Sequence, residues 1–381
     1  MRMSEFLGKI GRGAAWTIGS MKPIEQNKIV ISSFFGKGYG DNLRPIAEEL
    51  MRRRNNLDIV WLTADKQAAD SLPEGIRAVD YNSPQKIVEL STAKVWLDNC
   101  RKGTRRKREG QIYVQTWHGF ALKRIEKDVV ESLGDWYEEY AKRDSAQTDL
   151  IVSDSRFMTE VYRRAFWYDG EIQEFGSPRN DALINGDEET YKLVRSRFEL
   201  PEDCRIVLYA PTFRADKSME PYSIDYARLR KSCEERFGGR FAVLIRLHPN
   251  IMKQAEELSF DNETTFDASA YQDMQELLSA ADVVITDYSS LMFDFMLTRR
   301  PCFQYASDIE AYRNDRNFNF SLDKLPFPLA ENNDELESKI LSFDDAAYQN
   351  GLKKFNEEFG IIADGQAASR CVDWILDKMK G

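Results

Sequence analysis

The sequence predicts an α/β protein made of two halves, each built on a parallel sheet. Short apolar runs alternate along the chain with helical stretches, an order typical of parallel strands with helices on both faces. The chain has 381 residues, a length that suggests about two domains. A second alternating series follows an acidic stretch over residues 187–202, so we expect the two halves to join there.

In the first half, runs rich in β-branched and aromatic residues predict buried strands. These strands cover residues 28–33, 59–62, 95–97, 112–114, 150–152 and 172–175. Helices are predicted over residues 43–54, 85–91 and 125–147 and from residue 156 onward. Asp41 or Asn42 can cap the first of them.

The second half repeats this alternation. Its strands are predicted over residues 206–210, 241–247, 283–285 and 302–305 and around Phe266, and its helices over residues 274–280, 291–297, 331–345 and 365–379. We therefore divide the chain into an N-terminal amphipathic segment (1–25), two α/β domains (26–186 and 187–360) and a C-terminal helix (361–381).

Composition excludes several classes of protein. Hydrophobic residues make up 42% and charged residues 30%, an ordinary globular balance, and the net charge of −10 argues against a general nucleic-acid binder. The five cysteines are scattered and form no CxxC pair, which argues against a disulfide framework or a zinc site and for a reducing compartment. No apolar run approaches the ~20 residues that span a bilayer, so we expect a cytosolic or peripheral protein.

Two segments carry basic charge that could meet an anionic surface. The first is residues 101–108, with Arg101, Lys102, Arg105, Arg106, Lys107 and Arg108, followed by Lys123, Arg124 and Lys127. Such an island predicts contact with anionic lipid headgroups or phosphates, or else a solvated loop. The second is residues 1–25, where apolar residues at helical spacing alternate with basic ones, as in a helix that lies in a membrane plane or packs on the protein itself.

The chain contains two histidines, His118 and His248. Each follows an apolar run that predicts a strand, and each is next to a turn-former. Imidazole has an unperturbed pKa near neutrality and is the usual proton acceptor for a hydroxyl nucleophile. Two such residues at strand ends in different halves suggest one cleft between the domains, although both could instead be structural histidines.

Glycines follow the first predicted strand. Gly36, Lys37 and Gly38 lie in a stretch that could let backbone amides approach a ligand closely. Their spacing is not GxGxxG, so a dinucleotide fingerprint is not supported.

The second half has its own candidate ligand site after the strand at residues 283–285. Asp287, Ser289 and Ser290 lie where a helix begins, and the free amides and dipole of a helix start attract phosphate. Arg214, Arg246 and His248 follow other strands of the same predicted sheet, and ligands bind beyond the carboxyl ends of such strands. A diphosphate would therefore meet two guanidinium groups, an imidazole and a helix N-terminus.

Taken in order, these motifs resemble those of the CDP-glycerol glycerophosphotransferases of wall teichoic acid synthesis. The matching blocks are Ser33–Tyr39, Gln115–Gly119, Ala210–Arg214, Arg246–Pro249 and Thr286–Asp294. The resemblance implies a GT-B fold, in which two Rossmann-like domains, one for the acceptor and one for the nucleotide donor, face each other across a cleft. It also implies that His118 is the catalytic base, next to Gly119, and that His248, Ser289 and Ser290 hold the diphosphate of CDP-glycerol, from which CMP is released.

The resemblance further implies a primase-like enzyme at the cytoplasmic face of the membrane, with an undecaprenyl-diphosphate-linked saccharide as the acceptor. One departure concerns Phe120 and Ala121, where the family usually has threonine followed by proline or a similar residue. A bulky ring beside the base would leave the identity of the acceptor open.

Three alternatives remain open from the sequence: a transferase for CDP-ribitol or another polyol, a sugar-nucleotide glycosyltransferase of the same fold, and a non-catalytic nucleotide- or lipid-binding scaffold. Retaining glycosyltransferases often carry a Glu-x7-Glu pair where this chain has Asp287 and Asp294, and this mismatch in acidic spacing argues against the second alternative. The presence of both histidines argues against the third, because a scaffold needs groups that bind phosphate but no base. No carboxylate cluster forms a dedicated metal cage, so the only metal considered is a Mg²⁺ held weakly on the diphosphate.

Overall fold

The computed structural model describes residues 14–54, 56–102, 107–214, 222–247, 260–309 and 318–380. The chain forms two compact units. The first comprises Met1–His118, Ile125–Asp181 and Ile361–Gly381, and the second comprises Gly119–Arg124 and Ala182–Gly360. The main junction thus lies at Asp181, and the C-terminal helix belongs with the first unit.

The first unit is built on a seven-stranded parallel sheet with the order β3-β2-β1-β4-β5-β6-β7. Its strands are β1 (Glu25–Ser32), β2 (Asp58–Thr63), β3 (Ile76–Asp80), β4 (Ala93–Asp98), β5 (Ile112–Gln115), β6 (Leu150–Ser153) and β7 (Glu171–Glu174). Its helices are residues 14–20, α2 (Leu43–Arg53), α3 (Lys66–Asp70), α4 (Pro84–Thr92), η1 (Glu126–Ser132), α5 (Asp135–Ser145), α6 (Arg156–Ala165), η2 (Pro178–Asn180) and α15 (Ala367–Lys378).

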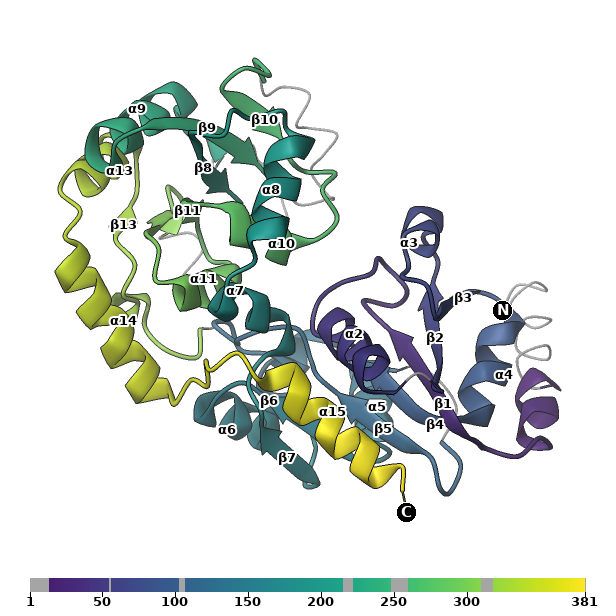
Figure 1. Ribbon diagram of the computed structural model, residues 1–381. Helices are drawn as coiled ribbons and strands as arrows, with labels where there is room; N and C mark the ends of the chain where they lie inside the picture. The colour runs from purple at the N-terminus through teal and green to yellow at the C-terminus, as the bar shows by residue number, and fades with distance from the viewer. Residues whose placement is uncertain are drawn as a thin grey trace. The chain divides into compact units, whose positions relative to one another are not determined.

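Alternation along the strands gives this sheet two buried faces. Ile29 and Ile31 of β1 point to one face and Val30 to the other, as the two-residue period of a strand requires. Helices α2 and α15 cover the first face, where they lie side by side (Figure 1). Helix α4 covers the second face, with Trp16 packed against it.

The second unit has a six-stranded sheet with the order β10-β9-β8-β11-β12-β13, again all parallel. Its strands are β8 (Cys204–Tyr209), β9 (Arg240–Ile245), β10 (Thr265–Asp267), β11 (Val283–Thr286), β12 (Cys302–Tyr305) and β13 (Leu329–Ala330). Its helices are α7 (Asp181–Asn185), α8 (Glu188–Arg197), α9 (Tyr226–Phe237), α10 (Met274–Ala280), α11 (Leu291–Phe295), η6 (Met296–Thr298), η7 (Leu322–Lys324), α13 (Asn333–Leu341) and α14 (Asp345–Phe359).

Both units therefore have the doubly wound Rossmann-like topology, and the predicted fold class is confirmed. The strand order reverses between β1 and β4 in one sheet and between β8 and β11 in the other. Ligands of such sheets bind outside the carboxyl ends of the strands at this switch point. The topology therefore predicts ligand sites in two regions: the loops after β1 and β4, and the loops after β8 and β11.

Two of the predicted helical segments differ from expectation. The long helix predicted over residues 125–147 is two helices, η1 and α5, which are separated at Gly134 because glycine is a poor helix former. In the N-terminal segment, Trp16 meets Trp96 edge-on at a centroid distance of 6.5 Å, while Ile18 is 57% exposed. The described part of that segment thus packs on the first unit. None of the helices within the described ranges is long and apolar enough to cross a membrane.

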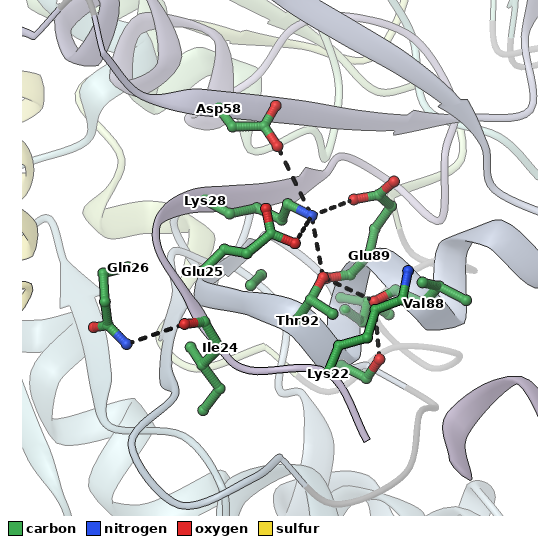
Figure 2. Close-up of polar contacts among 12 residues, drawn as sticks. Lys22, Ile24, Glu25, Gln26, Lys28, Asp58, Val88, Glu89 and Thr92 are labelled. Atoms are coloured by element: carbon green, nitrogen blue, oxygen red, sulfur yellow. Dashed lines mark hydrogen bonds and ion pairs between the residues drawn. The ribbon is translucent and has the colours of Figure 1, made fainter. Parts of the chain in front are cut away.

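A buried lysine joins two strands and a helix at the amino-terminal edge of the first sheet. Lys28 is 6% exposed, and its Nζ lies 2.7 Å from Glu25, 3.0 Å from Glu89 and 3.8 Å from Asp58 (Figure 2). Burial alone would lower the pKa of Lys28, but its hydrogen bonds to Glu25 and Glu89 outweigh that effect and raise it. The amine therefore stays charged and neutralises carboxylates that the fold has brought together.

We expect Lys28→Met to destabilise the protein by about 3–5 kcal/mol, because it removes the nearer cation of the buried Glu89 carboxylate and leaves only Arg77 at 3.5 Å. Urea unfolding followed by circular dichroism measures this. Lys192→Met is the matched control, since Lys192 forms an exposed ion pair with Glu189, and its unfolding curve should match that of the unmodified chain. Equal unfolding curves for the two variants would contradict the structural role of Lys28.

Candidate functional site

The loop after β5 presents His118 at the carboxyl edge of the first sheet. The Gln115 side chain accepts a hydrogen bond from the Trp117 amide at 2.9 Å, and Asn42 donates to the Trp117 carbonyl at 3.1 Å. Trp117 has a φ of 50°, and its ring stacks on His118 at 4.3 Å and meets Phe166 edge-on at 4.7 Å. Packing and side-chain hydrogen bonds thus hold a strained turn that sets the direction of the imidazole.

A single hydrogen bond determines which nitrogen of His118 carries the proton. Nδ1 lies 2.7 Å from the main-chain oxygen of Asn99. A carbonyl oxygen can only accept, so Nδ1 must donate, and Nε2 of the neutral ring keeps its lone pair. Burial lowers the pKa of His118 below the ordinary value of 6.5, and this outweighs the opposite effect of the Asn99 hydrogen bond and of Asp41. At neutral pH the ring is therefore an uncharged base.

Asn99 is itself held by the loop after β1. Its Oδ1 accepts from the Phe34 amide at 2.8 Å, and its Nδ2 donates to Asp41 at 2.9 Å. Arg179, after β7, pairs with Asp41 at 2.7 Å and donates to the main-chain oxygen of His118 at 2.9 Å. The carboxyl ends of β1, β4, β5 and β7 thus meet in one buried network around the imidazole.

Asn99 and Arg179 were not among the predicted site residues, and Asn42 does not cap helix α2 with its side chain as predicted. Asn42 occupies the N-cap position of α2 without a capping hydrogen bond. Its side chain instead accepts from Ser177 and from the Arg179 amide, at 2.9 and 3.1 Å. The sequence feature that could have identified these residues is their position directly after predicted strands, because such residues meet at one edge of the sheet.

The backbone amides of the glycine-rich loop after β1 were predicted to approach a ligand. The hydrogen bonds of this loop instead indicate a structural role in the turn. The amides of Gly36 and Lys37 both donate to the Ser33 carbonyl, at 2.8 and 2.9 Å, so these two amides are occupied within the turn. Gly36 has a φ of 88°, and a Cβ there would lie 2.7 Å from the Tyr81 side chain, which explains why glycine is needed. Lys37 is exposed and Gly38 is half-buried.

The described basic residues of segment 101–108 pair with protein groups. Arg101 is 4% exposed and donates to Glu126 at 2.8 Å, and Lys102 is 5% exposed and pairs with Asp98. The side chains at 107 and 108 bond to a carboxylate and to main-chain carbonyls. Two members lie outside the described residues: Arg105 and Arg106. The described members of this segment thus hydrogen-bond within the protein, three of them to carboxylates, and an anion-binding surface here stays a prediction.

In the second unit, the predicted donor-site residues follow three neighbouring strands, β9, β8 and β11. Arg214 does not offer its guanidinium to a ligand. It is 6% exposed, and it bonds to Asp287 at 2.9 Å and to both oxygens of Asp308 at 2.6 and 3.1 Å. We therefore replace its predicted diphosphate contact with a structural role, because a doubly paired guanidinium has little capacity left for phosphate.

Asp287 likewise bridges loops and is not arranged to bind substrate. Its carboxylate accepts from the Thr212 amide at 2.9 Å and from the Tyr288 amide at 2.6 Å, and it is 1% exposed. These bonds join the loop after β8 to the loop after β11 across the switch point. They determine where the chain enters the next helix.

Ser289 and Ser290 lie half-buried where α11 begins. Ser290 is at the N-cap position without a capping hydrogen bond, and Ser289 Oγ is 3.4 Å from the Leu291 amide. Both hydroxyls are thus placed to donate to a ligand at this edge. Helix α11 has five residues and continues as the 3₁₀ helix η6.

Arg246 differs from Arg214 in its surroundings. It follows β9 directly, is half-buried, and donates to the main-chain oxygen of Gln272 at 3.2 Å. Within the described ranges no carboxylate forms an ion pair with it. Burial lowers the pKa of Arg246, and Asp273 acts in the opposite direction. A partly desolvated guanidinium at a sheet edge is the type of group that binds phosphate. The neighbouring candidate His248 lies outside the described residues.

Phe120, which follows His118 and Gly119 in the sequence, packs in the core of the second unit. It is 4% exposed and belongs to the second unit. Its ring lies 4.5 Å from Phe293 and 5.8 Å from Phe359. At this position the departure from the family pattern contributes to packing within the second unit.

Two further features of the described part of the chain are its cysteine thiols and its potential metal ligands. All five cysteines are buried with free thiols, and burial raises the pKa of Cys100, the thiol nearest His118. Among the residues that the structure describes, no group of three or more histidine, cysteine, aspartate and glutamate side chains could hold a metal ion.

Residues 14–377 match the family described as CDP-Glycerol:Poly(glycerophosphate) glycerophosphotransferase. The chain is 33% identical over 378 residues to the teichoic acid poly(glycerol phosphate) polymerase of Staphylococcus epidermidis, which covers 94% of this chain and 51% of that protein. It is 30% identical over 370 residues to the teichoic acid glycerol-phosphate transferase of Staphylococcus aureus, which covers 92% and 93%. The chain thus spans about half the length of the first relative and most of the second.

A solved structure of the wall teichoic acid polymerase TagF has the same fold. It aligns with a TM-score of 0.85 at 29% sequence identity, over 100% of this chain and 99% of that one. The family match covers both parallel sheets and all five motif blocks. The resemblance read from those motifs is confirmed, and the chain belongs to the CDP-glycerol:poly(glycerophosphate) glycerophosphotransferase family.

Proposed function

We propose that this chain transfers glycerol phosphate from CDP-glycerol to a hydroxyl group of a teichoic acid acceptor and releases CMP. The acceptor oxygen attacks the phosphorus that carries glycerol, the bond from that phosphorus to the CMP oxygen breaks, and the hydroxyl proton passes to Nε2 of His118. Membership of the family supports this substrate class. The observation that carries the mechanism is the hydrogen bond from His118 Nδ1 to Asn99, because it leaves Nε2 free to accept a proton.

The donor diphosphate has its own set of residues in this proposal. Arg246 supplies a guanidinium without a carboxylate partner in the described part of the chain, and Ser289 and Ser290 supply hydroxyl donors. His248 is added from its motif alone. Phosphoryl transfer needs positioning and charge neutralisation more than covalent chemistry from the protein, and a Mg²⁺ held weakly on the diphosphate would add to both.

For the acceptor, we propose an undecaprenyl-diphosphate-linked saccharide, with the enzyme peripheral to the cytoplasmic face of the membrane. We propose a primase-like role because the motif resemblance implies it; the relatives that match this chain include both a glycerol-phosphate transferase and a poly(glycerol phosphate) polymerase. Arg124 and Lys127 are exposed members of the predicted basic surface, and cations of this kind are attracted to anionic headgroups.

We expect His118→Ala to lower kcat by roughly 10²–10⁴-fold, the usual contribution of a positioned general base. CDP-glycerol binding measured by calorimetry should stay unchanged, because the diphosphate residues are in the other unit. In the unmodified enzyme, the acid limb of kcat/KM should have its midpoint below 6.5, since burial lowers the pKa of this imidazole and activity is lost only when the ring becomes protonated. Full turnover by His118→Ala would rule out the base assignment.

The two arginines of the second unit should respond differently to the same substitution. Arg214→Met leaves Asp287 and Asp308 unpaired, so we expect a loss of about 3–5 kcal/mol in the free energy of unfolding. Arg246→Met should keep the stability and raise the Kd for CDP-glycerol by roughly tenfold or more, the value of a charge-assisted hydrogen bond. If Arg246→Met binds CDP-glycerol normally, the donor site lies elsewhere.

A donor panel separates the remaining alternatives. CDP-glycerol, CDP-ribitol and UDP-sugars are each incubated with a synthetic lipid-linked saccharide, and the released nucleotide is identified as CMP, UMP or UDP, the last being the leaving group of glycosyl transfer. We expect CMP with CDP-glycerol and little release with the others. CMP from CDP-ribitol alone would indicate a different polyol. Release of nucleotide from UDP-sugars would indicate a glycosyltransferase, and binding without any release would indicate a scaffold.

A further inference from the structure

The chain leaves the first unit directly after His118. Residues Gly119–Arg124 belong to the second unit, and the chain returns to the first at Ile125. The proposed base is therefore the last residue of one unit and is covalently joined to a segment that packs in the other.

On its first-unit side, His118 is held at two points. Its Nδ1 donates to the Asn99 carbonyl at 2.7 Å, and its own carbonyl accepts from Arg179 at 2.9 Å. The bond to Asn99 sets the ring and the bond to Arg179 sets the main chain. Only Gly119, with a φ of 136° that favours glycine, separates this residue from Phe120.

On the second-unit side, Phe120 is an apolar anchor. Its buried ring contacts four phenylalanines of that unit, of which Phe293 is nearest at 4.5 Å. The other three are Phe320, Phe355 and Phe359. A side chain with this many ring neighbours holds the backbone that carries it, because moving it would open a cavity in a close-packed core.

Asn319 adds a polar anchor to the same segment. Its side-chain amide donates to the carbonyls of Ala121 and Lys123 at 2.7 and 3.0 Å, and its own main-chain amide donates to Leu122 at 2.9 Å. Lys123 also forms an antiparallel bridge with Phe318. The segment after the base is thus bonded to the second unit along most of its length.

We infer that Phe120 and Asn319 are positioning residues for His118, because within the second unit they anchor the backbone that follows the base. This inference rests on the proposed role of His118 as the base. Misplacement of a reacting group by about 1 Å can cost 10²-fold in rate, so loss of the anchor should affect turnover while leaving nucleotide binding intact.

The test compares Phe120→Ala with Phe343→Ala. Phe343 is a buried phenylalanine of the second unit whose ring neighbours are Phe237, Phe303 and Tyr348, so both variants remove one buried ring from that unit, but only Phe120 is joined through Gly119 to the base. We expect Phe120→Ala to lower kcat by roughly tenfold or more with KM and Kd for CDP-glycerol unchanged, and Phe343→Ala to keep kcat despite a similar shift in its urea midpoint. Phe120→Leu, which keeps an apolar anchor, should recover most of the turnover.

A second readout does not depend on activity. The chain has two histidines, so protein labelled with ¹³C at histidine Cε1 gives two signals, and His118→Ala identifies the signal of His118. Within the described part of the first unit, the charged and titratable groups that act on this imidazole include Asp41, Arg179, Glu126 and, at 3.9 Å, Cys100. We expect Phe120→Ala to move the His118 signal and bring its titration closer to 6.5, whereas Phe343→Ala should leave both unchanged.

Equal effects of the two alanine variants on kcat, or an unmoved His118 signal in Phe120→Ala, would overturn the positioning role. A moved signal together with full turnover by His118→Ala would have a different meaning. The anchor would then act on the imidazole as inferred, and the assignment of that imidazole as the base would fail instead.

Discussion

The hydrogen bond from Nδ1 of His118 to the main-chain oxygen of Asn99 is the interaction on which the functional interpretation depends. It has a length of 2.7 Å, and because its acceptor is a carbonyl it determines the tautomer without any carboxylate next to the ring. The surrounding structure supports this one bond: Asp41 and the Phe34 amide hold Asn99, and Arg179 holds Asp41. Four strand ends of the first sheet thus contribute to the state of one nitrogen.

Buried ion pairs occur near both candidate regions. Whether an arginine has such a carboxylate partner separates those with a structural role from the one that we propose binds a ligand. Arg179 and Arg214 both pair with buried aspartates, which makes them parts of the scaffold. Arg246 has no carboxylate partner in the described ranges and donates to a main-chain oxygen. Burying a guanidinium without a carboxylate costs free energy of desolvation, and a phosphate bound at this sheet edge would offset that cost.

Much of the fold could be predicted from sequence because the central strands are short apolar runs rich in β-branched residues. Runs of this composition are typical of buried strands. Strand β3 was missed since charged residues interrupt it, and α14 because Gly351 lies within it. The site was less predictable. Arg214 pairs with Asp308, which is 94 positions away, and the burial of Phe120 depends on rings that come from distant helices. No local pattern reveals contacts of this kind.

The most direct measurement of the central claim is the tautomer of His118 at neutral pH. In protein labelled with ¹⁵N in its histidines, the signals absent from His118→Ala belong to this ring, and their chemical shifts report which nitrogen carries hydrogen. We predict a protonated Nδ1 and an unprotonated Nε2, in accord with the hydrogen bond to Asn99. A ring protonated at Nε2 alone, or at both nitrogens, would contradict the account because no lone pair would remain to accept the proton of an acceptor hydroxyl.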